Sequence, residues 1–369
     1  MQQTRTIVVW LVVIVVVIVA LIISYQVFQS GSNQASQNTG PGSSVTADDA
    51  SARIFRSEDA GASWRGVPGT RSISITRMAF VKGGPALLVG TAGAGLWKST
   101  DTGITFAQLK DPSGRMDAKA AITDMLVVPE AGRDAYLAAY YQNKGRVLEL
   151  AGMQFTERYF TPLDRVQVTG IVRDPLNRSR LFISSSDGGF LESNDAGGTW
   201  KLRHQFTEGA VLLVANPHVA GMMWVAGGRG AVLRTDDYGQ TWADSQTATQ
   251  SLRYQPRTGY SSTQIQGLYV DPVRDILYRA SAEGLTRSSD HGATWNPVNL
   301  PLLPGSIAVT AFAIDPVHPS VTYVSAGAQL YKTADGGESW KGTDFGGKRK
   351  IMSIVIDPKN TRVVIIGFE

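Results

Sequence analysis

The segment Ser57-Glu58-Asp59-Ala60-Gly61-Ala62-Ser63-Trp64 decides the fold, because its order of Ser or Thr, Asp, Gly and a final aromatic residue recurs along the chain. We call each copy a box. The other five boxes carry Ser99, Asp101, Gly103 and Phe106; Ser193, Asp195, Gly197 and Trp200; Thr235, Asp237, Gly239 and Trp242; Ser288, Asp290, Gly292 and Trp295; and Thr333, Asp335, Gly337 and Trp340. Consecutive box aspartates are 42, 94, 42, 53 and 45 residues apart. Such a period is typical of propeller blades.

The gap of 94 residues is twice 47, which predicts a seventh, degenerate box near residue 148. The stretch 146–155, RVLELAGMQF, fits this position. It keeps a strand-forming run, a Gly and the final aromatic residue, but it lacks the Ser and the Asp. The chain therefore contains seven repeats.

Each repeat also carries two strand-like runs before its box, and the first of them often ends in Asp-Pro, as at 171–175 and 354–358. With the strand that enters the box and the strand that carries its aromatic residue, this makes four short strands per repeat. The globular part begins with a third strand at 52–57 and ends with a second strand at 362–368. We expect an all-β fold over residues 52–369, a single seven-bladed β-propeller closed by pairing these two half-blades.

The box aspartates Asp59, Asp101, Asp195, Asp237, Asp290 and Asp335 are expected to be structural. An Asp carboxylate can accept backbone N–H groups across a tight hairpin, and a Gly permits positive φ there. Carboxylates dispersed around one rim cannot converge on a substrate.

The boxes resemble the Asp-box, or sialidase-type, repeats over about residues 52–369. Together with the Asp-Pro strand ends, they are most similar to three groups: the photosystem II stability/assembly factor family, the sortilin propeller and the xyloglucanase-type glycoside hydrolases. The resemblance implies a propeller, but it says little about function.

Enzymatic activity is the less favoured expectation. The sialidase Arg-Ile-Pro signature is reduced to Arg53-Ile54-Phe55, which lacks the Pro. The sialidase family also has six blades, whereas seven repeats are counted here. A glycoside hydrolase needs two carboxyl groups in one cleft, for which Asp124 and Asp187 are the candidates. We expect no cofactor and no metal site, since the four histidines are scattered and the chain has no cysteine.

Composition excludes further classes. The net charge is +4, from 35 basic and 31 acidic residues, and the longest basic run is Lys348-Arg349-Lys350. No nucleic-acid partner is therefore indicated.

Residues 7–24, IVVWLVVIVVVIVALIIS, form an uncharged apolar run of roughly 27 Å as a helix, long enough for a bilayer core. We interpret it as an uncleaved transmembrane signal anchor, with a cleaved signal peptide as the alternative. Arg5 places residues 1–6 in the cytoplasm and the propeller outside it, in the periplasm, the lumen or the extracellular space. Residues 25–51, rich in Gly, Ser, Asn and Gln, are expected to be a flexible linker.

The expected binding face lies opposite the boxes. The longest loop between repeats, 245–264, carries Arg253, Tyr254, Arg257 and Tyr260. Other residues expected on this face are Tyr140, Tyr141, Lys144, Arg115, Lys119 and Arg229. Tyr and Arg are favoured at binding hot spots, although a solvated basic surface is an equal alternative. The expected function is a monomeric, membrane-anchored protein-binding or assembly scaffold; the alternative is a glycan-binding or glycan-cleaving propeller.

Overall fold

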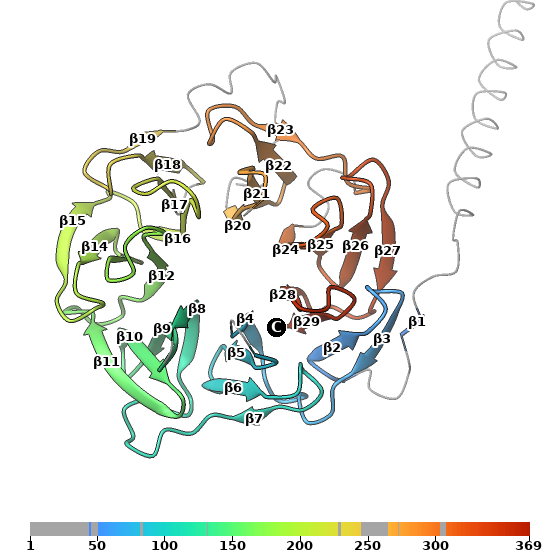
Figure 1. Ribbon diagram of the computed structural model, residues 1–369, viewed down its shortest axis with the longest axis horizontal. Helices are drawn as coiled ribbons and strands as arrows, with labels where there is room; N and C mark the ends of the chain where they lie inside the picture. Colours follow the sequence, from blue (N-terminus) through green and yellow to red (C-terminus); the bar gives the residue numbers. More distant parts are fainter. Residues whose placement is uncertain are drawn as a thin grey trace, which may run out of the picture. The chain divides into compact units, whose positions relative to one another are not determined.

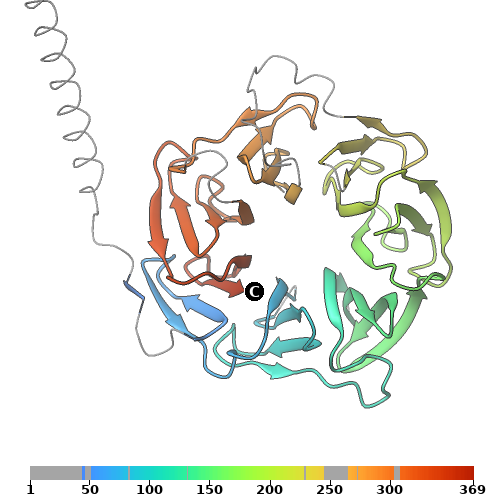
Figure 2. The same cartoon turned by 180° about the vertical axis from the view of Figure 1, so that it is seen from behind.

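Seven β-sheets surround a central axis in a closed ring, so the expected seven-bladed propeller is confirmed (Figures 1 and 2). The computed structural model describes residues 44–45, 51–81, 84–130, 132–227, 230–244, 265–271, 273–302 and 308–369. In these ranges no helix has the length and hydropathy that a bilayer span requires. The expected anchor, 7–24, and most of the expected linker lie outside them.

Six blades each contain four strands that follow one another along the chain, and we number these blades in chain order. Blade 1 has β4 (Ile75–Phe80), β5 (Leu87–Thr91), β6 (Leu96–Ser99) and β7 (Ala107–Gln108). Blade 2 has β8 (Ala121–Glu130), β9 (Arg133–Tyr141), β10 (Lys144–Ala151) and β11 (Gln154–Phe160). Blade 3 has β12 (Val168–Arg173), β13 (Leu181–Ser185), β14 (Gly189–Ser193) and β15 (Lys201–Gln205). Blade 4 has β16 (Ala210–Ala215), β17 (Met223–Gly227), β18 (Val232–Thr235) and β19 (Ala243–Asp244). Blade 5 has β20 (Ile265–Val270), β21 (Leu277–Ser281), β22 (Gly284–Ser288) and β23 (Asn296–Pro297). Blade 6 has β24 (Val309–Ile314), β25 (Thr322–Ala326), β26 (Gln329–Thr333) and β27 (Lys341–Asp344).

The closing blade joins the two ends of the propeller. It is built from β28 (Ile351–Ile356), β29 (Val364–Phe368), β2 (Ile54–Ser57) and β3 (Ser63–Gly66). β2 pairs antiparallel with β29, with Ile54 opposite Gly367 and Ser57 opposite Val364. The expected two-plus-two closure is therefore present, and it leaves no open edge between the first and last strands.

A further strand, β1 (Ser44–Val45), pairs in parallel with the outer edge of β3, opposite Ser63 and Trp64. These two residues fall within the expected linker, 25–51. A strand of two residues is too short for an alternation of apolar and polar residues to mark it in the sequence.

The first strands of all the blades line the axis and share one irregularity. Each contains a β-bulge near its start, at the second residue in six strands, such as Thr76 in β4, and at the third residue, Thr123, in β8. Several bulged threonines donate to the first strand of the next blade; the Thr76 Oγ1 atom lies 2.6 Å from the Ile122 carbonyl oxygen. Thr123 and Thr310 make the equivalent bonds to Val168 and Ile351. The bulges therefore connect neighbouring blades around the axis.

The boxes form the hairpins between third and fourth strands, as in blade 3. The Ser193 Oγ atom is buried, accepts the Gly197 N–H at 2.8 Å and donates to Asp195 at 2.8 Å. The Asp195 carboxylate in turn accepts the backbone N–H and hydroxyl of Thr199. All six boxes repeat this pattern of contacts.

The box hairpins also hold adjacent blades together. The hydroxyl of Tyr136 in blade 2 donates to the carbonyl of Ala196 in the box of blade 3. The indole of Trp224 in blade 4 donates likewise to His291 in blade 5. The box Gly packs closely against the previous blade: a Cβ atom on Gly239 would lie 2.2 Å from the Phe190 ring. The box residues therefore form the hairpin turn and also contact the neighbouring blade.

Candidate functional site

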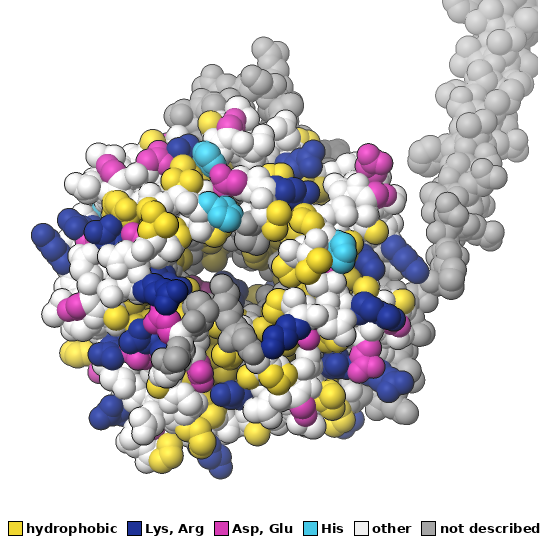
Figure 3. All heavy atoms as spheres, in the orientation of Figure 1, with side chains coloured by type: hydrophobic (Ala, Val, Ile, Leu, Met, Phe, Trp, Pro, Cys, Tyr) yellow, Lys and Arg dark blue, Asp and Glu magenta, His cyan; other side chains and the backbone are white. Residues whose placement is uncertain are grey.

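A cavity of about 220 Å³ lies on the propeller axis, between the first strands of the blades. Figure 3 shows the hollow in the middle of one face. Its polar lining includes Arg77, Asp124, Thr169, Gln266 and Ser353. Aliphatic, methionine and aromatic side chains and one glycine form the rest of the described wall. It combines a few convergent polar groups with an apolar surface, as ligand sites usually do.

Arg77 and Asp124 come from equivalent positions of β4 and β8, one residue after each bulge. Their closest approach is 3.4 Å, between the Arg77 Nε and Asp124 Oδ1 atoms. The other Asp124 oxygen accepts the Ile171 N–H at 2.9 Å, which fixes the carboxylate to blade 3. The carboxylate therefore acts as a link between three blades.

Tyr269, from β20, approaches the cavity from the far side of the ring. Its ring lies over Gly267, where a Cβ atom would lie 2.4 Å from the nearest ring carbon. Burial raises the pKa of the Tyr269 hydroxyl, and the positive charge of Arg77 acts in the opposite direction. The hydroxyl stays protonated at neutral pH and can donate a hydrogen bond.

The two carboxylates considered for hydrolysis do not share this cavity. Asp124 lines it, whereas Asp187 lies in the β13–β14 turn, where it accepts the Ser185 hydroxyl. Asp124 is the single acidic side chain among the described residues that line the cavity. The described lining therefore does not form the pair of facing carboxyl groups that glycosidases need.

The residues expected on the face opposite the boxes divide into two groups. Arg253, Tyr254, Arg257, Tyr260 and Arg229 lie outside the described residues. The described members lie in blade 2 and the loop before it, and most of them make internal contacts.

Tyr141 is buried, its hydroxyl donates to the Arg115 carbonyl, and the Arg146 guanidinium lies over its ring. Tyr141 therefore adds packing rather than exposed contact surface. Arg115 is exposed but donates to the Phe155 carbonyl. Lys144 is held by the Pro162 carbonyl and by Asp164 at 2.9 Å. Tyr140 is half-buried, and Lys119 is exposed.

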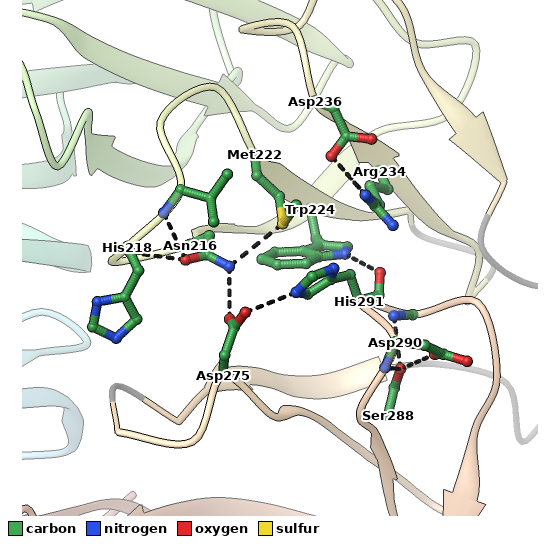
Figure 4. Close-up of polar contacts among 12 residues, drawn as sticks. Asn216, His218, Met222, Trp224, Arg234, Asp236, Asp275, Ser288, Asp290 and His291 are labelled. Carbon is green, nitrogen blue, oxygen red and sulfur yellow. Dashed lines mark hydrogen bonds and ion pairs between the residues drawn. The ribbon is translucent and has the colours of Figure 1, made fainter.

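A polar cluster between blades 4 and 5 was not expected from the sequence (Figure 4). The carboxylate of Asp275 lies between two side chains, 2.7 Å from the Asn216 Nδ2 atom and 2.7 Å from the His291 Nε2 atom. Asn216 is buried and also accepts the His218 N–H, so its orientation is fixed. The cluster connects two blades on the face that carries the boxes.

Sequence reasoning overlooked Arg77, Gln266, Gly267 and Tyr269. A signal was available in the first strands. The comparison is made two residues after the position that Arg77 holds in blade 1. There blade 5 carries Tyr269, whereas the other blades carry Ala, Val or Leu. A large polar residue at an axial position could have marked the cavity.

Comparison with known proteins finds no matching family model and no matching curated protein. Solved propellers are similar in fold. A xyloglucanase of glycoside hydrolase family 74 from Xanthomonas campestris has 16% identity and a TM-score of 0.60, over 80% of this chain and 51% of that chain. YCF48 bound to D1 peptide has 14% identity and a TM-score of 0.60, over 82% and 94%. YCF48 from Cyanidioschyzon merolae has 12% identity and a TM-score of 0.61, over 82% and 97%. The chain thus spans about half the length of the xyloglucanase, and at these identities the likeness concerns the fold alone.

Proposed function

We propose that this chain is a membrane-anchored, non-catalytic propeller of Asp-box type that binds a protein partner and acts as an assembly scaffold. The main observation behind the proposal is that the carboxylate of Asp124 is already bonded within the protein. It pairs with Arg77 and accepts a backbone N–H of blade 3, and the described cavity lining contains no second carboxyl group.

The similar structures support a scaffold more than a hydrolase. The match covers almost all of YCF48 but only about half of the xyloglucanase. One of the YCF48 structures contains a bound D1 peptide. Glycan binding or cleavage is the second candidate, which the likeness to the xyloglucanases favours.

Partner binding is tested with the loop that separates blades 4 and 5. We expect Arg253→Ala with Arg257→Ala to weaken co-purification of the partner from solubilised membranes without changing the melting temperature, and high salt to weaken the wild type similarly. Arg65→Ala with Lys341→Ala, on β3 and β27, is the matched control. Equal recovery of the same proteins by both variants would exclude this face. Release of oligosaccharides from xyloglucan by the wild type would instead favour the second candidate.

The proposed location, with residues 7–24 in the membrane and the propeller outside the cytoplasm, is tested by adding protease to intact cells or spheroplasts. Cleavage within 25–51 should release the propeller. Protection of the linker would reverse the orientation inferred from Arg5.

A further inference from the structure

The central cavity contains Arg77, whose charge Asp124 balances but whose N–H donors the described residues use only in part. The residues equivalent to Arg77 in blades 3 to 6 are Gly170, Leu212, Gly267 and Ala311. The Arg77 side chain is 37% exposed, and its 3.4 Å approach to Asp124 is longer than the roughly 2.7–2.9 Å of a strong charge-assisted hydrogen bond. Its Nη1 atom donates to the Thr76 carbonyl. A guanidinium has five N–H donors, and the bonds to Asp124 and Thr76 use only two of them at a residue that lines the cavity.

Tyr269 supplies a second donor on the opposite wall. The missing side chain at Gly267 makes room for its ring, and contact with Phe312, at 5.4 Å between ring centroids, supports it. Nothing in ring closure requires a tyrosine here, since blades 1 and 6 use alanine at the equivalent position. The arrangement therefore places a guanidinium and a phenol on facing walls of one cavity.

The remaining wall is apolar and the space is small. Leu212, Phe312 and Met352 contribute to it. The cavity of about 220 Å³ is larger than the roughly 150 Å³ apolar cavity that accepts benzene in another protein. This space suits a small organic molecule and excludes a folded partner.

We propose that the cavity binds a small organic monoacid, with its carboxylate on Arg77 and Tyr269 and its apolar body against Phe312 and Met352. The hydrogen-bond donors select this class, because a carboxylate can accept the remaining Arg77 N–H groups together with the Tyr269 hydroxyl. Asp124 already balances the Arg77 charge, which disfavours a ligand with more than one negative charge. Guanidinium groups match carboxylates in geometry, and a hydrogen bond to an ionised group is stronger than a neutral one. The site is independent of the protein-binding face proposed above.

Isothermal titration calorimetry of the full-length, detergent-solubilised protein with benzoate tests the proposal, with benzamide as the neutral probe of equal shape. We expect benzoate to bind at least about tenfold more tightly than benzamide, a difference of about 1.4 kcal/mol. Arg77→Gln should weaken benzoate binding at least about tenfold, and Tyr269→Phe several-fold. Gly267→Ala should also weaken it, because the added methyl group displaces the Tyr269 ring into the cavity.

Arg65→Gln, which removes an exposed arginine of the outer rim, is the matched control and should bind benzoate like the wild type. Thermal melting of each variant reports folding. If Arg77→Gln does not fold, Arg77→Lys and Tyr269→Phe decide the question. The proposal is overturned by equal affinities for benzoate and benzamide, by affinity that survives the cavity variants, or by absence of benzoate binding up to about 10 mM.

Discussion

Glu149 and Arg158 form an ion pair inside blade 2, with 2.6 Å between the Glu149 Oε2 and Arg158 Nη2 atoms. Glu149 is only 8% exposed, and its other oxygen lies 2.7 Å from the Arg133 Nε atom. Arg158 occupies a β-bulge of the fourth strand. Blade 3 repeats the arrangement with Glu192, also buried, and the bulge residue Arg203. Glu192 comes just before the box Ser, and Glu149 holds the equivalent position before Leu150; the other blades carry Arg or Lys there.

The first prediction concerns this pair. Glu149→Ala leaves the partly buried Arg158 without its counter-ion and leaves Arg133 with Glu130 alone, so we expect the free energy of unfolding to fall by about 3 kcal/mol. Urea denaturation measures the loss. The control is Glu58→Ala, which removes an exposed partner of Arg56 and should cost less than about 1 kcal/mol. Equal losses in the two variants would contradict the structural role assigned to Glu149.

The second prediction ranks two residues of one box. Ser193→Ala should destabilise by about 2 kcal/mol, because it leaves the buried Gly197 N–H without an acceptor. Asp195→Ala should cost less, because the Thr199 groups that it bonds are exposed and can turn to water. Denaturant midpoints of the two variants give the order. A larger loss of stability for Asp195→Ala than for Ser193→Ala would show that the carboxylate contributes more to the hairpin than the hydroxyl does.

The third prediction tests contact between blades. Gly239 has φ 81° and lies against the Phe190 ring. Gly239→Ala combines a strained backbone with a collision, so we expect a loss of more than about 2 kcal/mol. Gly336→Ala is informative as a control, since Gly336 has a similar φ of 79° and open space around its Cα. Similar thermal midpoints for the two variants would exclude the contact with Phe190 as the cause.

The fourth prediction concerns ring closure. Deleting residues 362–369 removes β29, whose residues are fully buried between β28 and β2. The whole propeller should then unfold at a much lower temperature, because β2 and β28, from the two ends of the propeller, lose the strand that joins them in one sheet. Deleting residues 26–40 of the expected linker should leave the melting temperature unchanged. A truncated protein that melts like the intact one would mean that closure adds nothing.

The fifth prediction is a dependence on pH. Hydrogen bonds from the Thr241 hydroxyl and N–H lower the pKa of Asp237 from 3.8 to about 2, and hydrogen bonds from Thr199 do the same for Asp195. A pKa below its unfolded value means that ionisation stabilises the fold above about pH 4, and that this contribution is lost as the pH falls toward 2. Unfolding measured between pH 4 and pH 2 should show the decline. Asp237→Asn with Asp195→Asn should make it shallower; an unchanged slope would contradict the assignment.

The sequence alone predicted the blades, their number and the closure, because turn chemistry is local. A Ser, an Asp and a Gly at fixed spacing form their hairpin from neighbouring backbone groups, so the pattern is visible wherever the chain repeats it. Even the degenerate box was found this way, and Gly152 does adopt a positive φ of 64° in the β10–β11 hairpin.

Only the tertiary structure decided which residues meet on the axis. Arg77 and Tyr269 stand 192 residues apart in the sequence, and neither belongs to a repeated motif. Closure of the ring brings their first strands to opposite walls of one cavity, and the bulges fix how those strands meet. Side chains that face an axis interact across the ring, not along the chain. Local spacing therefore predicted the fold, whereas the cavity depends on contacts that no local pattern encodes.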